Sequence, residues 1–300
     1  MRILFLGNHT VGVRSLDALA RDNAIVGVVA HPEDPEDGVR YQSVYDHAAG
    51  AGLSAARFKG RDPQLERFVR GVRPDLLWIA DYRYLLPQSV LDLAPLGAVN
   101  LHPSLLPNYR GRAAINWAIL RGERQIGLTA HFIDEGVDTG DIIAQKPVHI
   151  AEHEDVGDAL DKLYPIYESL SLEVVAAFRN GNVRRTPQPA GNWPIWPRRS
   201  AEDGLIDWSA DAQSIVNLIR AVARPYPGAF SWIENRRVTI WKARAGLARG
   251  PGSIGSIWRA DGGHLFVNCG EGSLQVLEYE MEGARRPRIG DRLDPMERAA

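Results

Sequence analysis

The residues best suited to chemistry lie in the stretch NLHPSLLPNYRGR, residues 100–112. Asn100 and His102 are two residues apart at the end of a short apolar run, so in a strand both side chains leave on the same face. An amide can donate a hydrogen bond to a developing oxyanion, and an imidazole can take up a proton near neutral pH. Pro103 and Pro107 restrict the path of the loop that follows. This combination suits acyl transfer to an amine.

A second polar stretch, DEGVDTGD at residues 134–141, directly follows another apolar run. Asp138 offers a carboxylate that can orient a histidine, and Gly136 and Gly140 allow a ligand to come close to the backbone. The same spacing of carboxylates is compatible with a calcium-binding loop. By itself, this stretch therefore leaves two kinds of site open.

A histidine pair provides a weaker candidate for a metal site. His149 and His153 are four residues apart, a spacing that can hold zinc on one face of a helix. However, Val148 and Ile150 flank His149 as they would at the end of a strand, and a third ligand is not evident. We expect no metal.

The first turn of the chain, GNHTVG, is bracketed by Gly7 and Gly12. Its glycines do not have the spacing of a dinucleotide-binding fingerprint, and no Lys-Ser or Lys-Thr follows to form a phosphate loop. The turn is either a simple strand-to-helix connection or part of a ligand site at the carboxyl edge of a central strand.

The segments that must position these residues alternate short apolar runs with helical patterns, which is typical of a mostly parallel sheet covered by helices on both faces. The helical patterns cover Val13–Arg21, Asp62–Gly71 and about Val156–Asn180. The predicted strands are Arg2–Gly7, Ala24–Ala30, Leu76–Ala80, Ala98–His102, Leu128–Ile133 and Ile142–Ile150.

The composition changes after this α/β half. Residues 184–200, RRTPQPAGNWPIWPRRS, have no helical or strand period and are expected to form an extended linker. We therefore expect a catalytic domain at 1–183, a linker at 184–200 and a small C-terminal β-barrel or sandwich at 201–300. The predicted elements of this last domain are one helix, Ala212–Ala223, and strands Gly228–Ile233, Arg237–Ala243, His264–Cys269 and Ser273–Glu280.

The overall composition excludes several classes of protein. The 300 residues are 45% hydrophobic and 24% charged, with no apolar stretch long enough for a membrane span. Cys269 is the single cysteine, which rules out an internal disulfide and is typical of a reducing cytoplasm. A net charge of -2 provides no general attraction to nucleic acid.

Together, the stretches at 100–112 and DEGVDTGDII at 134–143 resemble the signature of the folate-dependent formyltransferases. This family includes methionyl-tRNA, glycinamide ribonucleotide and sugar-nucleotide formyltransferases. RRSAEDGLIDWS at 198–209 and RAVARPYPGAF at 220–230 look like the C-terminal domain of the family members that have one. The resemblance implies a Rossmann-like catalytic domain, an OB-like β-barrel, 10-formyltetrahydrofolate as the donor, and Asn100, His102 and Asp138 as the catalytic set.

The resemblance also implies binding sites around this catalytic set. The folate is expected against the backbone near Tyr84–Pro87 and near the 134–141 stretch. The expected folate-binding residues are Tyr84, Leu85, Leu86, Pro87, Asp134, Gly136, Val137 and Asp141. The expected acceptor-binding residues are Gly7, His9, Thr10, Gly12, Ser104, Tyr109 and Arg110.

Three classes of amine compete as the acceptor. The tRNA-type enzymes carry a basic loop where this chain has residues 31–49. In this stretch Arg40 is the only Lys or Arg, and five residues are acidic: Glu33, Asp34, Glu36, Asp37 and Asp46. An acidic loop repels phosphates, so we expect no tRNA partner. HPEDPEDGVRYQSVYDHA, DYRYLLP and NYRGRAAINWAI resemble the sugar-nucleotide branch, which favours a nucleotide-linked amino sugar.

The remaining alternatives are weaker. Formyltransferases for hydroxyornithine or other natural-product amines share the core motif but differ from this chain after SLLP, where it has NYRGR. A binding module without activity is disfavoured because all three catalytic positions are intact. We expect a cytoplasmic enzyme with no membrane partner, for which a homodimer is one option.

Overall fold

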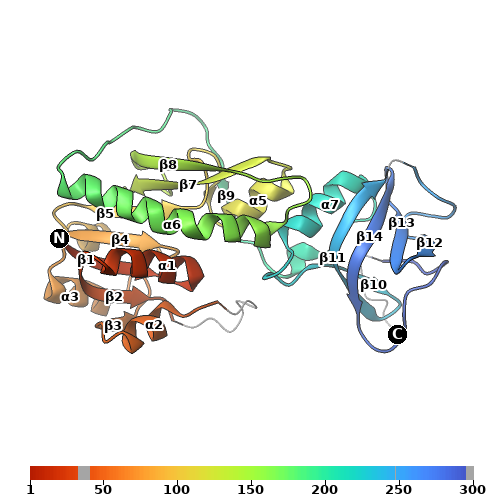
Figure 1. Ribbon diagram of the computed structural model, residues 1–300, viewed down its shortest axis with the longest axis horizontal. Coiled ribbons are helices and arrows are strands. Elements are labelled where there is room, and N and C mark those ends of the chain that lie inside the picture. The colour runs from red at the N-terminus through yellow and green to blue at the C-terminus, as the bar shows by residue number, and fades with distance from the viewer. Residues whose placement is uncertain (33–40, 247, 295–300) are drawn as a thin grey trace. The chain divides into compact units, whose positions relative to one another are not determined.

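The computed structural model describes residues 1–32, 41–246 and 248–294 (Figure 1). The chain divides into two compact units. The first comprises Met1–Ala114, Gln125–His149 and Leu160–Pro197, and the second comprises Ile115–Arg124, Ile150–Ala159 and the chain from Arg198 onward. Residues 184–197, the first part of the expected linker, thus belong to the first unit.

The first unit is built on a seven-stranded sheet with the order β3-β2-β1-β4-β5-β7-β8. The first five strands in this order are parallel, whereas β7 pairs antiparallel with β5 and with β8. The predicted mostly parallel sheet is therefore confirmed. The strands are β1 (Arg2–Gly7), β2 (Ala24–Ala30), β3 (Ala55–Arg57), β4 (Leu76–Ala80), β5 (Ala98–His102), β7 (Gln125–Phe132) and β8 (Ile142–His149).

The central strands are apolar on both sides because helices cover both faces of the sheet. Leu4 of β1 and Leu77 of β4 belong to one buried cluster with side chains of α3 (Pro63–Val72) and α4 (Gln88–Leu91). Trp78, which follows Leu77 and so points to the opposite face, donates its indole N–H to Ser15 Oγ of α1 (His9–Ala20) at 3.0 Å. Helices α1 and α3 therefore lie on opposite faces.

Helices that have a strong sequence signal begin and end close to their predicted bounds. The Asp62 side chain accepts a hydrogen bond from the N–H of Gln64 and caps α3, with Pro63 at its first position. The long helix α6 extends over Val156–Arg179, as predicted. Three short helices of the described residues were not predicted: α2 (Val44–Gly50), α4 and α5 (Ala114–Leu120).

The second unit contains a five-stranded antiparallel sheet with the order β10-β11-β14-β13-β12 and the ten-residue helix α7 (Ala212–Ala221). Ile215, Val216 and Ile219 of α7 are buried with the strand side chains in one core. The C-terminal β domain is thus confirmed, while its OB-like character stays a prediction. The strands are β10 (Ala229–Ile233), β11 (Arg236–Gly246), β12 (Ile257–Asp261), β13 (His264–Asn268) and β14 (Ser273–Met281).

Part of the acidic stretch that bears on the choice of acceptor lies outside the described residues. It includes Glu33, Asp34, Glu36, Asp37 and Arg40. In the described part of the chain, no helix combines the length and apolar character that a membrane span requires.

Candidate functional site

Strand β5 carries Asn100 and His102 into the interior of the first unit. Its neighbours in the sheet are β4 and β7, so β5 is a central strand. His102, its last residue, is buried, and Asn100 is half-buried. Both side chains approach the same third residue, Asp138, as expected for positions two apart in a strand.

Asp138 projects from the loop that connects β7 to β8. Its φ angle of 54° lies in the left-handed region, which is uncommon for a residue with a side chain. One carboxylate oxygen lies 3.5 Å from His102 Nδ1 and accepts the backbone N–H of Gly111 at 2.8 Å. The other lies 3.4 Å from Asn100 Nδ2. The structure therefore brings the three expected catalytic side chains together.

The His102 ring is held by a hydrogen bond at Nε2 and faces Asp138 with Nδ1. With its proton on Nε2, the ring donates a hydrogen bond of 2.8 Å to the backbone oxygen of Tyr109. Burial lowers the pKa of His102, an effect that the nearby Asp138 carboxylate partly offsets. Near neutral pH, His102 is therefore an uncharged imidazole whose free lone pair on Nδ1 faces Asp138, which suits it to accept a proton.

Asp138 remains ionised despite its burial. Burial alone raises the pKa of its carboxyl group, but His102, His131 and the N–H of Gly111 favour the anion and bring the pKa far below its usual range. A carboxylate in this place favours the protonated form of the neighbouring His102 ring.

His131 is a member of the site that the sequence did not single out. It lies opposite Asn100 in the pairing of β7 with β5 and is 2% exposed. Its Nδ1 donates to the backbone oxygen of Phe132 at 2.8 Å, so its Nε2 can accept a hydrogen bond from Asn100 Nδ2 at 3.2 Å. A histidine within the apolar run LTAHF was the available signal.

This arrangement defines the direction of the Asn100 amide. One N–H is engaged by His131, while the other forms only a long contact of 3.4 Å with Asp138 Oδ1. A contact of that length is weak, so a substrate oxygen can replace it. Asn100 thus has one N–H available for an oxyanion.

The loop from Pro103 to Ala113 holds the site through its backbone. Tyr109, Gly111 and Ala113 all have φ angles in the left-handed region, which turns the loop so that Tyr109 presents its oxygen to His102 and Gly111 its N–H to Asp138. A Cβ at Gly111 would overlap the backbone oxygen of Trp196 in β9 (Ile195–Trp196), which pairs with β6 (Arg110–Gly111). Glycine is therefore required here.

The residues expected to bind the acceptor fall into two groups. Gly7 ends β1, and His9, Thr10 and Gly12 follow it. His9 Nδ1 contacts Oδ2 of Asp81, which follows β4, at 2.5 Å. Ser104, Tyr109 and Arg110 lie in the loop after β5. Ser104 is buried and donates to the backbone oxygen of Asn108 at 2.7 Å, which indicates a structural role. Arg110 is also buried, and its guanidinium donates to Gln188 Oε1 at 2.6 Å.

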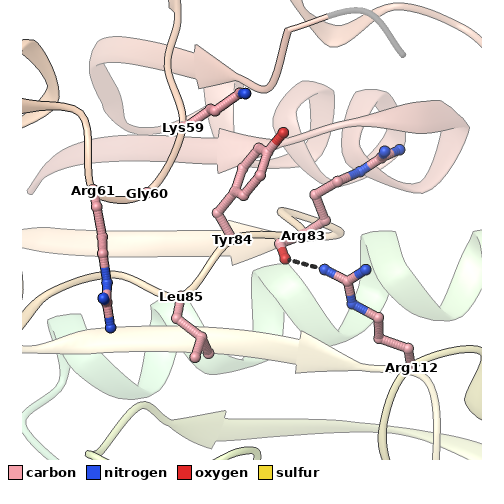
Figure 2. Close-up of a pocket in the computed structure, with 7 residues that line it drawn as sticks. All are labelled: Lys59, Gly60, Arg61, Arg83, Tyr84, Leu85 and Arg112. Atoms are coloured by element: carbon pink, nitrogen blue, oxygen red, sulfur yellow. Dashed lines mark hydrogen bonds between the residues drawn. The ribbon is translucent and has the colours of Figure 1, made fainter. Parts of the chain in front are cut away.

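Two of the expected folate-binding residues line a cavity of about 360 Å³ (Figure 2). Tyr84 and Leu85 form part of its wall, and the exposed fraction of Leu85 is 65%. The other lining residues are Gly60 and four cationic residues that the sequence did not single out: Lys59, Arg61, Arg83 and Arg112. In the view of Figure 2, Arg61 lies on one side of Leu85 and Arg112 on the other.

The other expected folate-binding residues have defined places outside this lining. Leu86 packs against the core, and Pro87 precedes α4 as its N-cap. Asp134 caps its own loop by accepting the N–H of Gly136 at 3.0 Å, and Asp141 pairs with Arg185 at 3.2 Å. Val137 directly precedes Asp138 in this loop.

A close packing contact explains Gly140 without a ligand. A Cβ at this position would overlap the backbone oxygen of Phe132.

Over the described part of the chain, no group of three His, Cys, Asp or Glu side chains is arranged to hold a metal ion.

Comparison with known proteins identifies the family. The formyl transferase model matches residues 1–175, and the model of the formyl transferase C-terminal domain matches residues 198–292. The chain belongs to the formyl transferase family. This formyltransferase is accordingly a folate-dependent N-formyltransferase, as the two sequence stretches predicted.

Similar curated proteins include methionyl-tRNA formyltransferases. That of Desulfotalea psychrophila is 35% identical over 291 residues, covering 95% of this chain and 90% of the relative. That of Geotalea uraniireducens is 34% identical over 297 residues, covering 97% of this chain and 94% of the relative.

Similar solved structures include sugar N-formyltransferases. WlaRD, a sugar 3N-formyl transferase, has a TM-score of 0.70 at 17% identity, covering 95% of this chain and 99% of that protein. An N-formyltransferase from Helicobacter canadensis has a TM-score of 0.68 at 17% identity, covering 93% of this chain and 99% of that protein. At this level of identity, the likeness shows a shared fold.

The lowered pKa of His102 predicts a pH-dependent stability. In the unfolded chain, His102 takes up a proton below about pH 6.5, whereas the buried imidazole resists protonation. The unfolded state then binds more protons, so the free energy of unfolding should fall as the pH drops from 7 to 5, by at most about 1.4 kcal/mol per pH unit from this group. Urea unfolding at several pH values should show a shallower decline in His102→Gln. Equal slopes in the two proteins would contradict the assigned direction.

Proposed function

We propose that this formyltransferase transfers a formyl group from 10-formyltetrahydrofolate to the amine of a nucleotide-linked amino sugar. The observation that supports this acceptor most directly is the acidic segment at residues 31–49, where Arg40 is the only Lys or Arg among five acidic residues. Binding of tRNA depends chiefly on neutralising its phosphates, which such a segment opposes. The resemblance of residues 81–87 and 108–119 to the sugar-nucleotide branch points the same way.

Initiator methionyl-tRNA is the second candidate acceptor. Its support is the identity of 32–35% to methionyl-tRNA formyltransferases over nearly the whole chain. The sugar N-formyltransferases are structural relatives at only 17% identity, one of them in a complex with folinic acid and dTDP-3-aminofucose. Sequence identity along the chain thus favours methionyl-tRNA as the acceptor, whereas the charge of residues 31–49 favours an amino sugar.

The proposed chemistry uses the cluster around Asp138. The acceptor amine attacks the formyl carbon as a neutral nucleophile, and Asn100 Nδ2 donates a hydrogen bond to the oxygen that becomes an oxyanion. His102 takes the proton that the amine loses, and Asp138 stabilises the resulting imidazolium. When the bond from the formyl carbon to the folate nitrogen breaks, His102 returns the proton to that nitrogen. No covalent bond to the protein forms.

The cationic cavity fits the acidic end of the proposed donor. A folate carries carboxylates on its glutamate tail, and Lys59, Arg61, Arg83 and Arg112 surround the segment at which the folate is expected. Arg112 donates to the backbone oxygen of Arg83 at 2.7 Å, which links the loop after β5 to the loop after β4. We assign this cavity to the glutamate tail, because paired cations attract carboxylates.

An assay across acceptors tests the proposal. With 10-formyltetrahydrofolate as the donor, we expect formylation of at least one dTDP- or UDP-linked amino sugar and none of initiator methionyl-tRNA or hydroxyornithine. Mass spectrometry of the products measures the outcome, with His102→Ala as the inactive control. Efficient formylation of the tRNA, together with binding that weakens steeply as salt rises, would establish the second candidate instead.

Variants of the three central residues test the proposed chemistry. Asn100→Ala removes one oxyanion donor and should lower kcat about 10²- to 10³-fold. His102→Ala removes the proton acceptor and should lower kcat roughly 10²- to 10⁴-fold. Asp138→Asn removes the charge that stabilises the imidazolium and should also lower kcat. Steady-state kinetics with the exposed His153→Ala as a control should show a loss in the first three alone. Near-normal kcat in His102→Ala would refute its role.

The donor cavity can be tested independently of the acceptor. Arg61→Gln and Lys59→Met each remove one cation, and each should raise the KM for a polyglutamylated donor about three- to tenfold while leaving kcat unchanged. The effect should be smaller with a monoglutamate donor. The matched control is Arg67→Gln, since Arg67 is an exposed cation of α3 outside the cavity lining. An equal KM in all of these proteins would exclude the assignment.

A further inference from the structure

The segment after α6 contributes a side chain to the catalytic loops. From Arg184 to Asn192, Gln188 is the one residue that is not exposed. Its Nε2 donates two hydrogen bonds, to the backbone oxygen of Asp138 at 2.8 Å and to that of Gly140 at 2.9 Å. Its Oε1 accepts from Arg110 Nη2 at 2.6 Å and from Arg110 Nε at 3.2 Å. Both donors and the acceptor of this amide are therefore engaged.

These contacts join the two loops on which the site depends. Asp138 belongs to the loop after β7, and Arg110 belongs to the loop after β5, directly between Tyr109, which holds His102, and Gly111, which holds the Asp138 carboxylate. Since Asp138 has a left-handed φ, its backbone needs support from its surroundings. Gln188 provides that support at the carbonyl group of the same residue.

The segment that carries Gln188 is itself anchored on both sides. Before it, the Thr186 backbone pairs with Ile142, with hydrogen bonds of 2.8 and 2.9 Å. After it, β9 pairs with β6, and the Trp196 ring stacks on Tyr109 with 5.4 Å between ring centroids. The position of Gln188 is thus defined by contacts that do not involve its own side chain.

We infer that Gln188 is a positioning residue for formyl transfer, which fixes the Asp138 carboxylate relative to His102 by tying the two loops together. The inference rests on the role proposed above for Asp138. A displacement of about 1 Å in a reacting arrangement can cost about 10²-fold in rate. The effect of losing Gln188 should therefore appear in kcat rather than in the KM of either substrate.

Two substitutions separate this role from simple anchoring of the segment. Gln188→Glu keeps the size and the acceptor for Arg110 but loses the two donors to the loop of Asp138, whereas Gln188→Leu loses all of these contacts. Both should lower kcat about 10- to 100-fold, with each KM within about twofold of its original value. The control Trp193→Phe removes a hydrogen bond to Pro189 O within the same segment and should leave kcat unchanged.

The pH profile gives a readout that anchoring alone would not change. The Asp138 carboxylate raises the pKa of His102 against the effect of burial. If Gln188→Glu displaces that carboxylate, the acidic limb of kcat should move to lower pH. An acidic limb at its original pH together with a normal kcat would overturn the inference. A loss of activity that merely parallels the unfolded fraction in a thermal melt would also overturn it.

A double-mutant cycle decides whether Gln188 acts through Asp138. In an Asp138→Asn background, Gln188→Glu should change kcat less than threefold, because residues that serve one function are not additive. Full additivity would overturn the inference. Hydrolysis of 10-formyltetrahydrofolate, followed by absorbance, provides a readout that needs no identified acceptor. If Asp138→Asn itself retained full activity, the proposed catalytic role would fail; a normal Gln188→Glu beside an impaired Asp138→Asn would reject the inference alone.

Discussion

The structure of the site depends on one interaction, the carboxylate of Asp138 beside the buried imidazole of His102. A buried charge is costly unless hydrogen-bond donors or opposite charges surround it. Asp138 obtains its donors from separate parts of the chain: Nδ2 of Asn100 and the backbone N–H of Gly111. Each segment must therefore reach its place before the anion is stable.

The demands of this charge explain the unusual backbone around it. A regular strand or helix would not direct the oxygen of Tyr109 and the N–H of Gly111 toward neighbouring groups, whereas left-handed residues turn the loop to do so. Such conformations persist only where other contacts hold them. The extended segment after α6 provides contacts of this kind, through Gln188 on one loop and through β9 on the other.

The proposed donor cavity, the cluster around Asp138 and the segment that bears on the acceptor differ in charge. The cavity around Tyr84 and Leu85 is lined by cations, which suits carboxylates, while the proposed catalytic cluster places one carboxylate among neutral rings and amides. The segment at residues 31–49 is acidic, which opposes binding to the phosphate backbone of a tRNA. The proposed donor cavity is thus positively charged, whereas the segment that bears on the acceptor is negatively charged.

Much of this architecture could be predicted from local patterns. Strands β1, β2, β4 and β5 begin and end at the predicted residues, because a strand buried on both faces must be apolar throughout. Elements with weaker signals were missed. The three residues of β3 are too few to show a period, and the apolar residues of α5 do not form one stripe.

The sequence by itself determined the reaction class, because two stretches jointly resemble the formyltransferases, and it proposed Asn100, His102 and Asp138 as the central residues. Only the tertiary structure decided which groups surround them. His131 joins Asn100 through strand pairing, Gln188 reaches Asp138 across 50 residues of sequence, and four cations from three separate loops line one cavity. Local patterns do not show that these residues meet, since hydrogen bonds and charge clusters between distant segments depend on how the sheet orders its strands.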